Sequence, residues 1–151
     1  MILACITHNG TDPLEVLSSG IMTGSRYKQV LADHVVPYKG LFKWFQQDNA
    51  SSHKIQEVLE YMNDEEIEIL HWPPYSPDLN CIENIWAYLK MKVRARNPTS
   101  VEEMTEVVTD IWYNDVRLKR LCNSVLNSMP SRIRAVVVVA AISGTDSQEE
   151  K

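Results

Sequence analysis

One acidic residue stands where a carboxylate could bind a metal ion. Asp48 follows the aromatic segment at residues 41–47, which is typical of a short strand, so its carboxylate falls at the carboxyl end of that strand. Ligands of open α/β sheets bind outside such strand ends, and carboxylate oxygens suit hard divalent cations. A second interpretation is an Asx turn, in which Asp48 and Asn49 lead into the next helix.

A second acid, Glu83, is separated from Asp48 by 34 residues. It could be a metal ligand, but the run Asn80-Cys81-Ile82-Glu83 also fits a capping box, in which Asn80 caps a helix and Glu83 reaches back. An acid in the first turn also suits the helix dipole. The preceding loop, residues 72–80, contains three prolines and is either a plain connector or a rigid support for a neighbouring functional group.

The elements that must position these acids can be predicted from hydrophobic spacing and turn signals. An Asn9-Gly10 turn predicts a hairpin, and Ser100 opens a helix with a capping box. The other short apolar runs predict strands, and apolar residues at helical spacing predict helices. Strands are expected at 1–7, 13–17, 41–47 and 67–70, and helices at 25–36, from Ser51 or Ser52 to about 62, 81–93, from 100 to 112, and 118–129. This order predicts an α/β fold, with helices packed on a mixed sheet.

The composition is that of one globular domain. The chain has 151 residues, of which 44% are hydrophobic and 23% charged, which argues against disorder. The longest apolar run, 135–142, is shorter than a membrane span and is expected to be a terminal strand or helix on the core. Three distant cysteines form neither a disulfide framework nor a metal motif. Without a signal-peptide pattern, an intracellular, non-secreted protein is expected, and its four tryptophans should be core or loop anchors.

The net charge of −5 hides an asymmetry along the chain. Residues 1–83 hold five bases and twelve acids, whereas residues 84–134 hold nine bases and five acids. Alternate cations follow one another in the basic half and could contact DNA phosphates. The same cations could instead form a solvated helix end that complements the dipole. They are Lys90, Lys92, Arg94 and Arg96.

Together, the two acidic motifs resemble the catalytic domain of Tc/mariner-type transposases. The resemblance rests on residues 46–53 (QQDNASSH) and 72–86 (WPPYSPDLNCIENIW), with the spacing of the second and third acids of that family. The segments 1–6, 20–31 and 129–134 are also similar to family segments. Two usual prolines are replaced, by Ser51 and Cys81.

This resemblance implies a ribonuclease-H-like fold and metal-dependent DNA cleavage and strand transfer. In such a site, three acids hold two magnesium (or manganese) ions about 4 Å apart for phosphoryl displacement. Asp48 matches the second catalytic, metal-binding acid and Glu83 the third. Asn49, His53 and Asn80 match supporting positions, and His53 is assigned to positioning. DNA is the implied partner, a homodimer is a further expectation, and the implied location is the nucleus, otherwise the cytoplasm.

The family's first aspartate lies on a strand before the segment that matches Met1. We therefore expect a partial catalytic domain at 1–142, a polar tail at 143–151, and a sheet that lacks its first central strand. With one metal ligand missing, catalysis by this chain alone is then not expected, and its metal binding is doubtful. An alternative is a non-catalytic, domesticated scaffold that binds DNA or protein. A chance match in an unrelated α/β protein is a third hypothesis.

Overall fold

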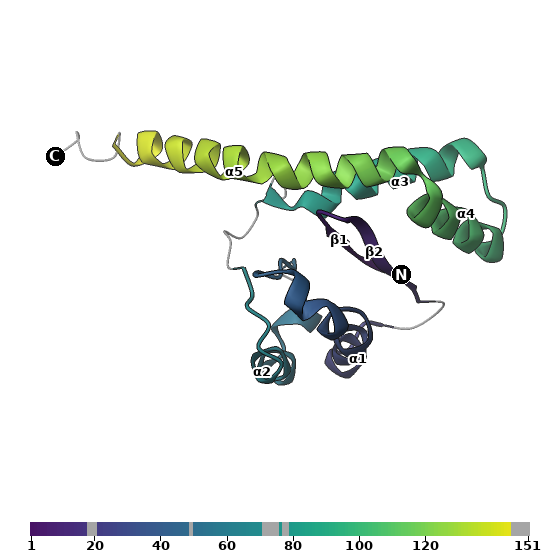
Figure 1. Cartoon of the computed structure of the whole chain (residues 1–151), viewed down its shortest axis with the longest axis horizontal. Coiled ribbons are helices and arrows are strands. Elements are labelled where there is room, and N and C mark those ends of the chain that lie inside the picture. The colour runs from purple at the N-terminus through teal and green to yellow at the C-terminus, as the bar shows by residue number, and fades with distance from the viewer. Residues whose placement is uncertain (18–20, 49, 71–75, 77–78, 146–151) are drawn as a thin grey trace. The chain divides into compact units, whose positions relative to one another are not determined.

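The computed structural model describes residues 1–17, 21–48, 50–70, 76 and 79–145, without the side chains of residues 12 and 138–145 (Figure 1). Its backbone divides into two compact units. The first unit contains Met1–Ala4 and Pro13–Ser76, and the second contains Cys5–Asp12 and Pro77–Lys151. The elements are β1 (Ile2–Thr7), β2 (Gly10–Val16), α1 (Gly24–His34), the 3₁₀ helices η1 (Val36–Leu41) and η2 (Ser51–Lys54), α2 (Gln56–Asp64), α3 (Cys81–Arg96), α4 (Val101–Asn114) and α5 (Val116–Thr145).

The predicted hairpin is confirmed, with an earlier return strand than expected. β1 and β2 form a two-stranded sheet. At the end opposite the turn, two backbone hydrogen bonds join Met1 and Leu17. Only Gly10 of the Asn-Gly pair has a positive φ, at 119°. Since glycine has no Cβ to clash in that region, β2 can begin at Gly10 itself and not at Pro13.

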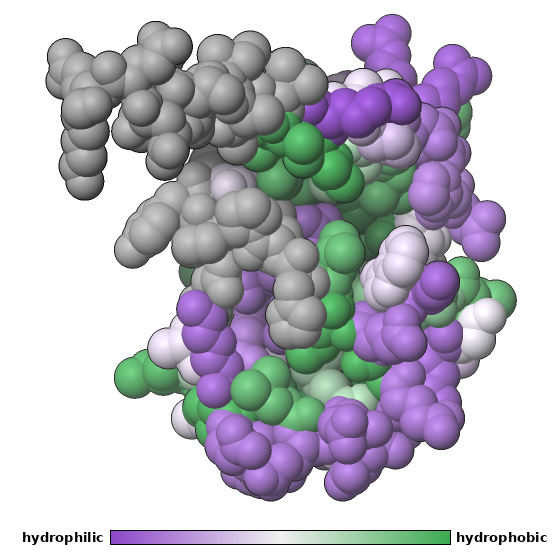
Figure 2. Space-filling model, turned by 90° about the vertical axis from the view of Figure 1, so that its left-hand side faces the viewer, coloured by the Kyte–Doolittle hydropathy of each residue, from purple (hydrophilic) through white to green (hydrophobic). Residues whose placement is uncertain are grey.

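In the first unit, α1 and α2 bury one apolar face each. Tyr27 and Leu31 of α1 and Val58 and Met62 of α2 are buried. Pro37 stands at the start of η1, as expected of a residue that ends the preceding helix. In Figure 2, hydrophilic side chains gather at the bottom of the view, where α1 and α2 lie, which agrees with the exposed outer residues of α2.

Two predicted strands, 41–47 and 67–70, are reduced to one parallel bridge between Phe45 and Ile69. The bridge has two backbone hydrogen bonds, from Phe45 N to Glu68 O (2.8 Å) and from Leu70 N to Phe45 O (2.9 Å). A regular strand needs a partner along its length, and in the described residues these segments have no other strand partner. The mixed character of the fold is confirmed, but its sheet is smaller than the sequence predicts.

In the second unit, α3 packs against both α4 and α5. Figure 1 shows α3 lying along the first part of α5. α4, which connects these two helices in the chain, lies at one end of the pair. Trp112 of α4 is fully buried and stacks on Trp86 of α3, with ring centroids 5.8 Å apart. α3 ends at Arg96, and the next residue, Asn97, has a φ of 48°, the left-handed conformation that commonly terminates a helix.

Three other local predictions are corrected by the structure. Ser51 and Ser52 do not cap α2; they belong to η2, and α2 begins after Ile55, which makes no capping hydrogen bond through its side chain. Pro130 does not end the last helix but lies inside α5, because its fixed φ is itself helical. Trp44 is not a core anchor: it is 55% exposed, with Lys43 over its ring.

The C-terminal run 135–142 is helical, within α5. The predicted polar tail begins inside the same helix, at residues 143–145, and the rest of it lies outside the described residues. In the described part of the chain, no helix is both long and apolar enough to cross a membrane.

Candidate active site

Asp48 lies three residues after the bridge residue Phe45 and presents a carboxylate that is 57% exposed. Its Oδ1 accepts a hydrogen bond from the backbone N–H of Ala50 at 3.0 Å. This is the bond of an Asx turn, so the structural interpretation from the sequence is confirmed. Within the described part of the chain, Oδ2 makes no hydrogen bond or ion pair, so the turn leaves this oxygen available to a ligand.

His53 is buried beside Asp48. Its Nδ1 lies 2.8 Å from Asp48 Oδ1 and 3.3 Å from the carbonyl oxygen of the same residue. Tyr27 of α1 stacks on the imidazole, with ring centroids 4.0 Å apart and planes inclined by 26°. The structure thus brings together two of the residues singled out from the sequence, Asp48 and His53.

Glu83 lies in the first turn of α3, which begins after Asn80. The backbone N–H of Glu83 donates to the Asn80 carbonyl at 3.2 Å, but the Asn80 side chain makes no capping hydrogen bond. The proposed capping by Asn80 is therefore wrong. The Glu83 side chain is exposed and has no hydrogen bond or ion pair among the described residues, so its carboxylate, like Asp48 Oδ2, is open to a ligand.

The two acids belong to different units, Asp48 to the first and Glu83 to the second. Asn49 and most of the proline-rich loop lie outside the described residues. Among the residues that are described, no three His, Cys, Asp or Glu side chains converge into a metal-binding group.

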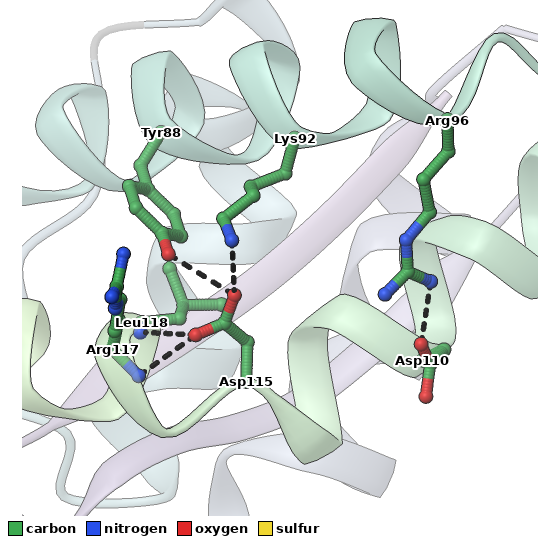
Figure 3. Close-up of polar contacts among 7 residues, drawn as sticks. All are labelled: Tyr88, Lys92, Arg96, Asp110, Asp115, Arg117 and Leu118. Atoms are coloured by element: carbon green, nitrogen blue, oxygen red, sulfur yellow. Dashed lines mark hydrogen bonds and ion pairs between the residues drawn. The ribbon is translucent and has the colours of Figure 1, made fainter.

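The four cations of α3 divide into two sets. Figure 3 shows Lys92 and Arg96 pointing toward α4 and the start of α5, where they pair with Asp115 (3.3 Å) and Asp110. Lys90 and Arg94 are exposed, and neither makes an ion pair within the described ranges. The alternation in sequence therefore does not give four equivalent DNA contacts, because two of the cations have carboxylate partners.

Asp115 carries several interactions at once. Burial raises the pKa of its carboxyl, but the backbone N–H groups of Leu118 and Arg117, with Tyr88 and Lys92, outweigh this and lower the pKa. Tyr88 donates to Asp115 Oδ2 at 3.0 Å, and the two N–H groups bind Oδ1 (Figure 3). Asp115 thus caps α5 and joins it to α3.

Sequence reasoning missed Tyr27 and Gln47, which surround the Asp48–His53 pair. The Tyr27 hydroxyl donates to Gln47 Oε1 at 2.7 Å. In the sequence, Tyr27 belongs to an apolar stripe of a helix, and that spacing predicts only burial. The one available signal was the position of Gln47 inside the motif next to Asp48.

The fold is shared with a domain of known structure. The structure matches the crystal structure of the catalytic domain of Mos1 mariner transposase with a TM-score of 0.72 and 20% sequence identity, covering 87% of this chain and 69% of that one. At this identity the likeness establishes the fold, which is that of a ribonuclease-H-like catalytic domain. That domain of Mos1 has also been solved together with Mn and with Mg.

The sequence comparisons then identify the family. The family described as DDE superfamily endonuclease matches residues 1–105, and this chain belongs to that family. It is 28% identical to the Tcb2 transposase of Caenorhabditis briggsae over 141 residues, 91% of this chain and 50% of that protein. It is 38% identical to the Tc3 transposase of Caenorhabditis elegans over 94 residues, 60% of this chain and 29% of that protein. The chain spans half or less of the length of these relatives, and its resemblance to Tc/mariner transposases is confirmed.

Proposed function

We propose that this chain is part of a DNA transposase catalytic domain in which Asp48 and Glu83 bind divalent metal ions. The observation that carries this proposal is the Asp48 carboxylate, whose Oδ1 is fixed by His53 and Ala50 while Oδ2 is open among the described residues. An oxygen held by two donors does not reorient freely, so the other oxygen presents a defined position to a cation. Glu83 supplies a second exposed carboxylate.

The donor set fits magnesium or manganese, because both cations favour carboxylate oxygens. When bound, such ions would polarise the phosphodiester and stabilise charge that develops on its oxygens. In this proposal, Asp48 and Glu83 offer carboxylate oxygens to the cations, and His53 fixes the carboxylate of Asp48. Asn49 and Asn80 are proposed as supporting residues next to these acids.

We expect this chain alone not to cleave DNA. The family resemblance implies three acids, of which this sequence matches two, Asp48 and Glu83. Two carboxylates leave most of the coordination positions of two cations to water, and fixed ligands are what orient a phosphodiester for in-line displacement. Catalysis then requires a third acid supplied from outside the matched residues.

DNA is the proposed partner. Structures of Mos1 include a paired-end complex with the left transposon end and a strand transfer complex. In this chain, the exposed Lys90 and Arg94 are the α3 cations best able to reach phosphates, whereas Lys92 and Arg96 have carboxylate partners. A homodimer and a nuclear location complete the proposal, and both rest on the resemblance to Tc/mariner transposases.

Titration of the full ¹⁵N-labelled chain with Mn²⁺ tests the metal site. A bound Mn²⁺ broadens nearby amide signals, and we expect the earliest broadening around Asp48 and Glu83. Asp48→Asn should abolish the effect at Asp48, and Glu83→Gln should abolish it at Glu83. Asp64→Asn, which removes an exposed acid of α2, is the matched control and should change neither. Uniform weak broadening in all variants would contradict the proposal.

A magnesium-dependent nicking assay tests the expected inactivity. The purified chain should leave a supercoiled plasmid intact. Nicking that Asp48→Asn abolishes would show a complete catalytic site and refute the expectation. DNA binding without any Mn²⁺ effect at Asp48 or Glu83 would instead favour the non-catalytic scaffold.

A further inference from the structure

α1 places an aromatic side chain against the candidate metal site of the first unit. Thr23 caps the helix by accepting a hydrogen bond from Arg26 N at 3.3 Å. Gly24 lets the helix start close to the segment that follows His53: a Cβ at this position would lie 2.9 Å from Ile55 Cδ1. One turn along, Tyr27 is 5% exposed and stacks on His53.

Tyr27 contacts the chain on both sides of Asp48. Its hydroxyl donates to Gln47, the residue before Asp48, at 2.7 Å. Its ring stacks on His53, five residues after Asp48, at 4.0 Å between centroids. A buried aromatic residue in a helix is usually a packing residue only, but this one also touches the neighbour of Asp48 and its hydrogen-bond partner.

The contacts of the stacked imidazole indicate which of its nitrogens donates. His53 Nδ1 faces Asp48 Oδ1 at 2.8 Å and the Asp48 carbonyl at 3.3 Å. Both oxygens are acceptors, so Nδ1 must carry hydrogen to make these contacts. Rotation of the ring would break both contacts, and the Tyr27 ring lies where it opposes that rotation.

We propose that Tyr27 is a positioning residue for the metal-binding carboxylate of Asp48. It holds Gln47 through its hydroxyl and His53 through its ring, and these two residues fix the backbone and Oδ1 of Asp48. Oδ2 is thereby kept in one position. This inference rests on the proposed function, which supplies the metal ion, whereas the contact of Tyr27 with His53 does not require a metal ion. Outer partners of metal ligands commonly set metal affinity in this way.

The first measurement uses the metal-free full chain. Long-range ¹H–¹⁵N spectra of the His53 imidazole report which nitrogen carries hydrogen. We expect a single Nδ1–H form in the wild type. Tyr27→Leu, which removes the ring stack, should give a mixture of forms, whereas Tyr27→Phe should keep the Nδ1–H form. Tyr38→Leu, which removes an exposed tyrosine of η1, is the matched control and should leave the imidazole unchanged.

The second measurement is the Mn²⁺ titration of Asp48 in the same variants. Tyr27→Leu should weaken Mn²⁺ binding about tenfold, and Tyr27→Phe, which only releases Gln47, about threefold. An unchanged His53 spectrum in Tyr27→Leu, or unchanged Mn²⁺ affinity in both Tyr27 variants, would overturn the proposal. If Tyr27→Leu does not fold, the test is the Mn²⁺ affinity of Tyr27→Phe, which should be about threefold lower than that of the wild type.

The two proposals fail in different ways. Absence of Mn²⁺ broadening at Asp48 in the wild type would refute the metal-binding function. A changed His53 tautomer in Tyr27→Leu would still support the hold of Tyr27 on the Asp48–His53 pair, and an unchanged one would overturn it.

Discussion

Lys92 Nζ lies 3.3 Å from Asp115 Oδ2, so a cation of α3 is bound to the residue that joins α4 and α5. Tyr88, one turn earlier on α3, donates to the same oxygen. Side chains four residues apart share one face of a helix, which explains why Tyr88, Lys92 and Arg96 point together in Figure 3. Lys90 and Arg94, offset by half a turn, are directed elsewhere.

Replacing Asp115 with Asn should destabilise the chain by about 1–2 kcal/mol, because it removes the charged acceptor of Lys92 and Tyr88 from a side chain that is 16% exposed. The folded-state pKa of Asp115 is lowered below its ordinary 3.8. Its stabilising effect is therefore present above pH 3.8 and is lost as the pH falls through the folded-state pKa. Urea unfolding at several pH values should show that the free energy of unfolding of Asp115→Asn falls less steeply toward acid pH than that of the wild type.

Asp110→Asn is the control for this measurement, since Asp110 also pairs with a cation of α3 but is 46% exposed. Its effect should be smaller than that of Asp115→Asn, as expected of surface ion pairs. Equal losses in the two variants would show that Asp115 has no special role at the helix junction.

If α3 contacts DNA, the contact should depend on Lys90 and Arg94. Each cation that neutralises a phosphate contributes about 0.9 to the slope of log affinity against log salt. We expect Lys90→Gln with Arg94→Gln to lower the slope by about 1.8, measured by fluorescence anisotropy with duplex DNA. Arg96→Gln, which removes an ion-paired cation, should lower it less. A larger change in the slope for Arg96→Gln would contradict the assignment of Lys90 and Arg94 as the DNA contacts.

Trp112 should be the tryptophan on which the second unit depends most. It is fully buried, whereas its stacking partner Trp86 is half-buried. Trp112→Ala should cost about 3–5 kcal/mol, because truncation leaves a cavity in a packed interior. Trp86→Ala should cost less. Chemical denaturation of both variants checks this, and a larger loss at Trp86 would contradict the assignment of the core.

The thiols should differ in reactivity. Cys81 and Cys122 are buried, and burial raises the pKa of the Cys81 thiol while Arg132 partly opposes the shift. Because the thiolate is the reactive form, both should react slowly with an aromatic disulfide reagent at neutral pH. Half-buried Cys5 should react first, and Cys5→Ser should remove this fast phase. Fast reaction that survives in Cys5→Ser would show that the α3–α5 contact opens.

The helices could be predicted because each has its own apolar stripe, whereas the end signals were right at Ser100 and wrong at Asn80 and Pro130. Ser100 accepts from Glu103 N at 3.0 Å, as the capping box predicts, although the Glu103 carboxylate binds Thr99 and not Ser100. The sequence could not show that the segments 41–47 and 67–70 form a single bridge and not full strands, because strand formation depends on a neighbour that local sequence does not specify. Among the described residues, Phe45 and Ile69 are the only two of these segments that pair as in a sheet.

The candidate site could be predicted in part. Asp48 and Glu83 were indicated by residue type, position and spacing, and the pairing of Asp48 with His53 brings two motif residues together. Tyr27 could not be assigned, because its contacts with Gln47 and His53 join residues 20 and 26 positions away. The separation of the α3 cations was also hidden, since it depends on carboxylates of α4 and its junction with α5.

Pro130 interrupts the hydrogen-bond ladder of α5, because its nitrogen cannot donate to the carbonyl of Leu126. A helix bends at least cost where such a bond is missing. The turns before this point are anchored by buried Leu118, Cys122 and Val125. Buried side chains thus hold the part of α5 before Pro130, and a bend of the helix at Pro130 would leave that part in place.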